Sequence, residues 1–585
     1  MTRFSFGLAS FGSIAIVIAA CGDPKSGSGF DDAGAGGGDG GTVDGSSSGS
    51  GSDAPDLLGD SGLGSEKIAI TPSNATLFVD MAKTPPAPAT QAYTAILHAT
   101  DGTTADVTGE IALSLADPVG TFAGATFTSA TTLPNGALGV TTKIHGAARG
   151  EQGEANLTVV ALRTSGDQRD FYFVEPYQDA PTPARDVLKF STTLKQVDVA
   201  ILEDTTGSMS GSIDNLKTNI SKAGGIIDGL KNAIPDVGIA IVDHRDYPYG
   251  GYGGGGDFPA KVWQVVTTNV AAAQTAVNNY SLGDGADDPE AQIPSMYYLL
   301  TGQALTWPGG SVPAHTPAAG TEGGVDFRSG SFRVVVEITD APWHNYDVGD
   351  DPGATPYTSI PTAPTYAQLK TAFTTLHSKF VGVRDGHGGT APVAESDNLS
   401  DATSSNVPPA AFGGACGAGK CCTGLNGAAV DPGGPGGSCR LNFDIADGNG
   451  LDQGIVKAIQ AISVGSSFDV TAIPSNDPKN PGGVDATKFI KQLRAMSEGD
   501  AASGCPAHAT KKSSPSLGYD DVFVAVVTGT PVCFEIVPET NTFVPPKDAA
   551  QFFNAFIDVV GLPGNTKLDR RTVLFLVPPK DVGVK

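Results

Sequence analysis

One short stretch carries most of the information about the fold: V-D-V-A-I-L-E-D-T-T-G-S, residues 197–208. Its apolar half predicts a buried strand. The apolar residues that follow are spaced three, four and seven apart, which predicts one face of a helix; they are Ile213, Leu216, Ile220, Ile227 and Leu230. The carboxylate of Asp204 and the hydroxyls of Thr206 and Ser208 are therefore expected on one tight loop. Hard divalent cations such as Mg²⁺ prefer oxygen ligands, so the stretch predicts a metal site.

Two further segments extend this pattern. Residues 331–340, S-F-R-V-V-V-E-I-T-D, predict a second buried strand that ends in an acid, and the chain continues as A-P-W-H. Residues 287–291, D-D-P-E-A, lie between the two strands in the sequence. In this order, D-x-T-x-S, D-x-P-E and T-D-A-x-x-H resemble the metal-ion-dependent adhesion site of von Willebrand factor A domains, in the form found in integrin β subunits.

The resemblance covers about residues 195–500 and implies a set of metal ligands. One Mg²⁺, or Ca²⁺ or Mn²⁺ in its place, would bind to Asp204, Thr206, Ser208, Glu290 and Asp340. The resemblance also implies that the open position of the metal accepts a carboxylate from a protein partner. A further metal site would use Asp287 with Glu290, although Gly285 stands where the integrin pattern has Asn. The acids of a second, inhibitory integrin site are replaced by Gly211 and Ser212.

The composition limits the class of partner. The chain has 585 residues, enough for three or four domains, with 36 Lys and Arg against 62 Asp and Glu. Binding to a phosphate backbone needs a basic surface, so this acidic balance argues against nucleic acid as a partner.

The N-terminus carries the pattern of an export signal. Arg3 precedes an apolar run at residues 14–20 that is too short to span a bilayer, and Cys21 follows it. The sequence I-A-A-C resembles a bacterial lipobox, which implies cleavage of a signal peptide at residues 1–20 and lipidation of Cys21. The alternative is a plain signal peptide with a chance cysteine. We therefore expect an anchor in the bacterial cell envelope, at the outer membrane, facing the periplasm or the cell surface. Residues 21–65 are dominated by Gly, Ser and Asp and predict a flexible tether.

Six cysteines remain after Cys21, and an even number in an exported chain predicts disulfides. Proximity in sequence favours pairing within the first four and between the last two; in chain order they are Cys416, Cys421, Cys422, Cys439, Cys505 and Cys533. A zinc site built from the first four is the alternative, but their spacing is irregular.

The rest of the chain predicts a multidomain protein. Residues 66–165 alternate apolar and polar residues, and I-T-P-S-N-A-T-L at 70–77 resembles the start of bacterial immunoglobulin-like domains, which implies an all-β spacer. Residues 195–500 alternate strands and helices, which predicts an α/β, doubly wound, Rossmann-like A domain with a parallel sheet. By analogy with integrin β subunits, residues 170–194 and 520–585 are expected to form a small β-sandwich around it.

Several elements of the A-like domain follow from periodicity. Strands are predicted at 237–242, 380–383 and 468–473, and helices at 366–376, 455–462 and 489–493. A Cys-rich insertion, residues 385–449, is rich in Gly and Pro and is expected to lack regular structure of its own. Because it leaves the carboxyl end of a parallel strand, it is expected at the metal edge, where it would select the partner.

These patterns predict a surface-anchored lipoprotein that uses a metal-dependent A-like domain for adhesion. The alternative is a non-adhesive scaffold of an envelope complex with a structural metal. A minor alternative is a phosphotransferase of the haloacid dehalogenase type, because D-T-T-G-S and G-D-G-A-D at 283–287 resemble its motifs. That pattern lacks its Lys, and its second segment follows a predicted helix. Nucleophile-elbow, Walker and H-E-x-x-H patterns do not occur, so we expect no enzyme. Residues 243–246 and His344 are expected to have structural roles.

Overall fold

We describe a computed structural model of the chain, which covers residues 66–163, 165, 169–346, 355–386 and 392–580. Cys21, the predicted signal peptide and the predicted tether lie outside these residues. Among the residues described, no helix is both long enough and apolar enough to cross a membrane.

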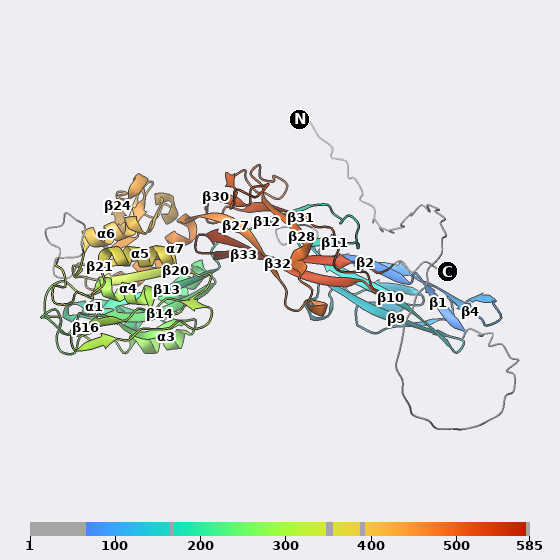
Figure 1. The fold of residues 1–585 in the computed structure, drawn as a ribbon, viewed down its shortest axis with the longest axis horizontal. Coiled ribbons are helices and arrows are strands. Elements are labelled where there is room, and N and C mark those ends of the chain that lie inside the picture. Colours follow the sequence, from blue (N-terminus) through green and yellow to red (C-terminus); the bar gives the residue numbers. More distant parts are fainter. Residues whose placement is uncertain (1–65, 164, 166–168, 347–354, 387–391, 581–585) are drawn as a thin grey trace, which may run out of the picture. The chain divides into compact units, whose positions relative to one another are not determined.

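The α/β part contains a six-stranded sheet that is parallel except at one edge (Figure 1). In spatial order its strands are β15 (Lys261–Thr267), β14 (Asp236–His244), β13 (Gln196–Asp204), β20 (Phe332–Thr339), β21 (Lys379–Asp385) and β26 (Asn442–Ile445). Only β15 runs antiparallel to its neighbour in this sheet. The chain order reverses between β13 and β20, because β14 and β15 lie on one side of β13 and the later strands lie on the other.

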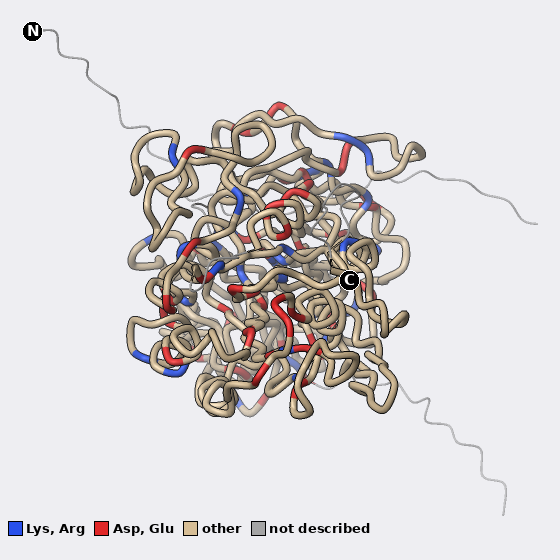
Figure 2. Tube along the Cα trace, turned by 90° about the vertical axis from the view of Figure 1, so that its left-hand side faces the viewer, with Lys and Arg blue, Asp and Glu red and all other residues tan. Residues whose placement is uncertain are grey.

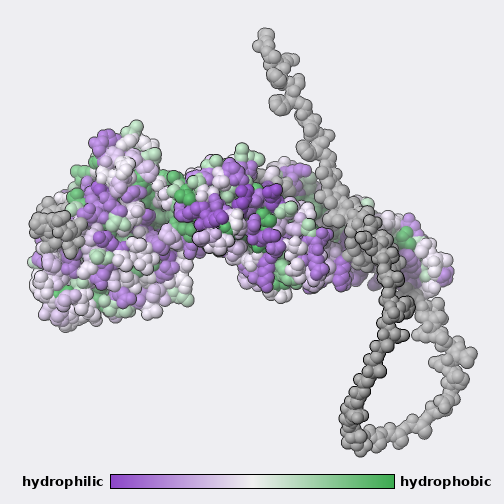
Figure 3. Space-filling view, turned by 45° about the horizontal axis from the view of Figure 1, so that its top comes forward, coloured by the Kyte–Doolittle hydropathy of each residue, from purple (hydrophilic) through white to green (hydrophobic). Residues whose placement is uncertain are grey.

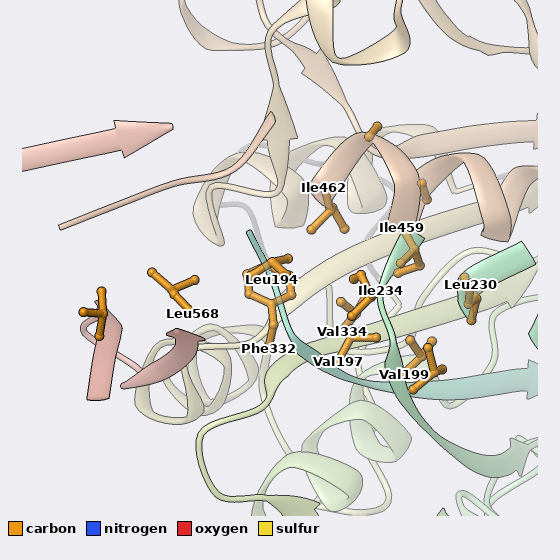
Figure 4. Close-up of a cluster of buried hydrophobic side chains, with 14 of the residues drawn as sticks. Leu194, Val197, Val199, Leu230, Ile234, Phe332, Val334, Ile459, Ile462 and Leu568 are labelled. Carbon is orange, nitrogen blue, oxygen red and sulfur yellow. The ribbon is translucent and has the colours of Figure 1, made fainter. Parts of the chain in front are cut away.

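Helices cover both faces of this sheet, as the alternation of β13 requires. Val199 and Ile201 pack into one core, whereas Ala200 and Leu202 pack into a second core. The first core is closed by α1 (Ser210–Asn219), α2 (Ile226–Ala233), α3 (Val270–Val277) and α7 (Leu451–Gly465). The second is closed by α4 (Gln292–Thr301), α5 (Tyr366–Leu376) and α6 (Val393–Ala402). Figure 4 shows side chains of the first core, among them Val199, Leu230 and Ile459.

The helix predicted after β13 is two helices. The chain breaks between α1 and α2, where Gly224 adopts a positive φ of 74° that other residues rarely adopt. Ile213 and Leu216 on α1, and Ile227 and Leu230 on α2, nevertheless face the same core. The apolar spacing therefore identified the buried face but not the break.

The segments before and after the α/β part share two β-sheets. The first has the order β11 (Phe171–Val174), β33 (Thr566–Val577), β32 (Gln551–Leu562), β27 (Ser467–Asn476), β30 (Val522–Val527) and β29 (Thr510–Lys511). The second has the order β12 (Asp186–Phe190), β31 (Val532–Pro538) and β28 (Ile490–Ala495). Strands β11 and β12 thus pair with strands more than 300 residues later in the chain.

Two sequence predictions in this region need correction. The strand predicted at 468–473 forms as part of β27, but it pairs with β30 and β32 and not with the parallel sheet. The helix predicted at 489–493 is wrong: a single 3₁₀ turn, Ala486–Phe489, leads into strand β28. Leu493 and Ala495 are buried two residues apart on β28, so the strand period holds here and tertiary pairing with β31 decides the conformation.

The N-terminal part described, residues 66–163, consists of strands and turns with one short 3₁₀ helix, Pro134–Gly136. Its strands are β1 (Lys67–Thr71), β2 (Asn74–Asp80), β3 (Thr90–Ala92), β4 (Thr94–His98), β5 (Thr104–Asp106), β6 (Ala112–Leu115), β7 (Gly120–Ala123), β8 (Thr126–Ser129), β9 (Gly139–Ala148) and β10 (Glu151–Leu162). They form three small sheets around one apolar core that contains the buried Ile144, Leu157 and Val159.

The segment 385–449 is more regular than its composition predicts. It contains α6, the short strands β22 (Asn406–Val407), β23 (Cys421–Gly424), β24 (Ala428–Val430) and β25 (Cys439–Arg440), and also β26 of the main sheet. The expectation that it lacks regular structure is therefore wrong. The predicted pairing within the first four cysteines and between the last two is confirmed. Within the four, which the sequence left open, Cys416 bonds to Cys422 and Cys421 to Cys439; Cys505 bonds to Cys533.

Candidate metal centre

The predicted metal ligands meet at the carboxyl ends of β13 and β20. Asp204 is the last residue of β13, and Asp340 directly follows β20. The two strands are paired in parallel up to Glu203 and Ile338, so the two carboxylates leave the sheet side by side. This is the point where the strand order reverses, which is where open α/β sheets bind ligands.

The carboxylate of Asp204 is fully buried and held on both oxygens. Its Oδ1 accepts hydrogen bonds from the backbone NH and the Oγ1 of Thr206, at 2.9 and 2.7 Å. Its Oδ2 accepts a hydrogen bond of 2.7 Å from the Oγ1 of Thr339. Sequence reasoning missed Thr339, although it is the Thr of the T-D pair at the end of the second strand.

The carboxylate of Asp340 lies next to the hydroxyl of Ser208. The Oγ of Ser208 donates a hydrogen bond of 3.0 Å to Asp340 Oδ1. Burial, followed by the nearby charge of Asp204, raises the pKa of Asp340 to about 6, and the hydrogen bond from Ser208 opposes this shift. The two strand ends are therefore bridged by a hydroxyl–carboxylate contact.

Backbone hydrogen bonds join the loop that carries Glu290 to the loop after β20, which brings Glu290 next to Asp340. The NH of Glu290 donates to Pro342 O at 3.0 Å, and the NH of His344 donates to Glu290 O at 3.2 Å, so the two loops pair as a short β-bridge. The Glu290 side chain is buried, and its Oε2 has no hydrogen-bond partner. Burial raises the pKa of Glu290 to about 11, and the charges of Asp204, Asp246, Asp287 and Asp257 add to the shift.

A hollow of about 360 Å³ opens beside these groups. It is lined by Thr206, Ser208, Asp340, Glu290 and the loop 284–288, which contains Asp287. Acidic residues gather in the lower middle of Figure 2, where few basic residues are drawn. The hollow is therefore an acidic opening at the carboxyl edge of the sheet.

The donor set fits a hard divalent cation. Asp204, Glu290 and Asp340 place three carboxylates together, with the hydroxyls of Thr206 and Ser208 beside them. Within the described residues, no Lys or Arg forms an ion pair with any of the three acids. Buried carboxylates are costly unless a cation compensates them, and the orphaned Glu290 Oε2 is such a group. A bound Mg²⁺ or Ca²⁺ would remove this imbalance.

Asp287 turns toward a different group. Its Oδ2 lies 3.2 Å from His344 Nε2, which in turn lies 3.4 Å from Asp246 Oδ2. These three side chains form a group that could hold a metal ion. Asp243, near the end of β14, accepts a hydrogen bond from Trp263, and Arg245, which follows β14, pairs with Asp257.

The phosphotransferase alternative gains no support from the local structure. Residues 283–285 lie in a loop that follows α3, and the NH of Gly283 donates to Thr205 O at 2.8 Å. The motif that this segment resembles requires a buried strand before it. Here the segment instead supplies one wall of the acidic hollow.

Comparisons with known proteins give only distant likenesses. No protein-family model and no curated protein matches the chain. A solved structure of a von Willebrand factor type A protein from Catenulispora acidiphila is 12% identical, with a TM-score of 0.26, over 81% of this chain and 75% of that one. A pilus adhesin from Lactobacillus rhamnosus GG is 10% identical, with a TM-score of 0.27, over 79% of this chain and 54% of its own. A thread matrix protein from the mussel byssus is 9% identical, with a TM-score of 0.24, over 47% of this chain and 48% of its own. At these TM-scores the likenesses carry no argument, and the function is argued from the site itself.

Proposed function

We propose that the protein is an envelope lipoprotein whose α/β domain binds a protein partner through a divalent metal ion. The observation that carries this proposal is the buried group of Asp204, Glu290 and Asp340 beside an open acidic hollow. The ion would be held by the hydroxyls of the loop after β13, Thr206 and Ser208, and by carboxylates from both sides of the switch point. The ion would supply a positive centre for a carboxylate of the partner, which the acidic hollow alone would repel.

The ligands have distinct tasks in this proposal. Asp204 accepts three hydrogen bonds from Thr206 and Thr339, which fix its carboxylate and the loop that follows it. Ser208, Asp340 and Glu290 line the hollow and would contact the ion from there. A partner carboxylate would approach through the hollow, which is large enough for an acidic side chain.

The surface of the protein supports a polar rather than an apolar contact. In the space-filling view of Figure 3, hydrophilic residues dominate the described surface, and hydrophobic residues form small separate patches. On this face the described residues offer no broad apolar area for a partner.

The anchoring part of the proposal rests on the sequence. Lipidation at Cys21 would attach the protein to the outer membrane, the tether would give it reach, and the N-terminal β part would act as a spacer. The alternative function is a non-adhesive scaffold of an envelope complex, in which the metal only stabilises the fold.

The test combines metal binding with partner capture. Calorimetry with Mg²⁺ should show one site that is lost in Asp340→Asn and weakened in Ser208→Ala, with the fold retained by circular dichroism. Asp214→Asn, which changes an exposed acid on α1, is the control and should bind Mg²⁺ like the wild type. Capture of partner proteins from intact cells should need Mg²⁺ and be abolished by chelator.

Two results would contradict this proposal at different levels. Unchanged Mg²⁺ binding in Asp340→Asn would refute the proposed metal site. The other result is that the wild type binds Mg²⁺ as expected while partner capture is the same with chelator and in Asp340→Asn. That result would show that the metal does not bind the partner, and it would favour the scaffold alternative.

A further inference from the structure

A second group of possible metal ligands lies beside the predicted metal centre. Of its three residues, only Asp287 also lines the acidic hollow. Asp246 follows β14, Asp287 lies in the loop before α4, and His344 lies in the loop after β20. One ligand atom of each lies within 4.8 Å of the others. Asp246 and His344 are almost fully buried, whereas Asp287 is partly exposed, so the group opens to solvent on one side only.

Hydrogen bonds orient the buried pair. The Nδ1 of His344 lies 2.6 Å from the carbonyl oxygen of Thr355, so it carries a proton and donates it. The Oδ1 of Asp246 accepts from the hydroxyl of Tyr357 and from the backbone NH of Tyr247, each at 2.5 Å. These bonds leave Asp246 Oδ2 and His344 Nε2 facing each other, 3.4 Å apart. Metal-bound histidines are commonly held in this way, by a carbonyl or carboxylate on the other ring nitrogen.

These two facing atoms lack hydrogen-bond partners. Asp246 Oδ2 and His344 Nε2 are both buried, and neither makes a hydrogen bond within the described structure. With Nδ1 protonated, a neutral His344 would point the lone pair of Nε2 at two carboxylates, which is repulsive. A proton on Nε2 or on one of the carboxylates, or a metal ion, would remove this repulsion.

The spacing suits a metal ion. Ligands about 2.1 Å from a tetrahedral ion are separated by roughly 3.4 Å from each other. In the structure, His344 Nε2 lies 3.2 Å from Asp287 Oδ2 and 3.4 Å from Asp246 Oδ2. Hydrogen bonds of an imidazolium would be shorter, at about 2.7–2.9 Å.

We propose that Asp246, Asp287 and His344 form a second metal site, which takes a borderline divalent ion such as Zn²⁺ rather than Mg²⁺. An imidazole ligand suits Zn²⁺, Cu²⁺ or Ni²⁺, whereas Mg²⁺ prefers sites made of oxygen alone. The site does not depend on the adhesive role proposed above.

The test measures Zn²⁺ binding by calorimetry with Mg²⁺ in saturating excess, so that the oxygen-only centre is filled. The wild type should bind one Zn²⁺. Replacing a direct ligand should weaken binding by about 100-fold or more in His344→Gln and in Asp246→Asn. The control is His315→Gln, since His315 also pairs with an acid, at 3.0 Å from Asp326, but has no second carboxylate nearby.

Further variants separate the two sites and guard against misfolding. Asp340→Asn should lose Mg²⁺ binding but keep Zn²⁺ binding, so failure of one site is distinguishable from failure of the other. Asp287→Asn changes a partly exposed residue and should weaken Zn²⁺ binding without unfolding the protein. The proposal is overturned if the wild type binds no Zn²⁺, or if His344→Gln and Asp287→Asn bind it as tightly as the wild type.

Discussion

Individual side chains at the candidate metal centre have unequal roles despite similar chemistry. Asp204 accepts three hydrogen bonds and is fully buried, whereas Glu290 Oε2 accepts none. The difference arises because Asp204 begins a tight turn that returns Thr206 to its own carboxylate, while Glu290 enters from a loop that pairs through its backbone. Glu290 is therefore the residue most sensitive to a bound cation.

This sensitivity predicts a metal-dependent pH profile of stability. Folding raises the pKa of Glu290 from 4.5 to about 11 and that of Asp340 from 3.8 to about 6, so both bind more protons in the folded chain. In chelator, the free energy of unfolding should thus fall as pH rises above these unfolded values, by at most about 1.4 kcal/mol per pH unit for each group. Mg²⁺ should flatten the fall, because it stabilises the ionised carboxylates.

Thermal unfolding between pH 5 and 9, with chelator or with Mg²⁺, measures this profile. Glu290→Gln cannot ionise and should show a flatter profile in chelator and a smaller gain from Mg²⁺. An identical pH profile in wild type and Glu290→Gln would show that Glu290 does not carry the effect.

At the scale of elements, the N-terminus of α1 is fixed by the turn at 446–449. Asp385, at the end of β21, accepts hydrogen bonds of 2.8 Å from the backbone NH groups of Asp447 and Gly448 and from Ser212 Oγ. Gly211 lies against the same turn, where a Cβ would come within 2.4 Å of Asp447 O. Gly211 and Ser212 thus have packing roles at the N-terminus of α1.

This close contact predicts that Gly211→Ala destabilises the α/β part. The added methyl group would meet backbone atoms that cannot move aside cheaply, so we expect a loss of about 2 kcal/mol. Mg²⁺ affinity should fall as well, because Ser208 lies just before α1. Urea unfolding and calorimetry check both effects. Gly255→Ala is the matched control, since a Cβ there meets no atom within 4 Å; equal stability of the two variants would contradict the close packing.

At the scale of the whole molecule, strands that are neighbours in one sheet come from segments far apart in the sequence. Strand β11 pairs with β33, and β12 pairs with β31, so segments on both sides of the α/β part complete the same sheets. The segment 385–449 likewise supplies β26 to the main sheet and Leu399 to its second core. Removing all of it to test partner choice would damage the fold that carries the metal centre.

Anchoring is the other property of the whole molecule that a variant can test. If Cys21 is lipidated, Cys21→Ser should move the protein from the membrane fraction to the soluble fraction or leave its signal peptide uncleaved. Metabolic labelling with a fatty acid and fractionation measure this. A wild-type protein that takes up no label would show that the cysteine follows a plain signal peptide.

Much of the molecule could be predicted from the sequence alone, because the relevant signals are local. The bounds of α5, the apolar faces of α1 and α7, and the division of the cysteines into a group of four and a pair follow from periodicity or from proximity along the chain. The meeting of Asp204 and Asp340 was also predictable, since the carboxyl ends of adjacent parallel strands lie at one edge of a sheet.

Only the tertiary structure decided the features that depend on pairing between distant segments. Residues 490–495 become strand β28 because β31 offers an edge, although their sequence also suits a helix. Residues 467–476 join the sheet of β32 for the same reason. The meeting of Asp246, Asp287 and His344 was missed because each residue lies on a different loop, and the loops are far apart in the sequence. Local periodicity records which face of a segment is buried, but it does not record which distant segment buries it.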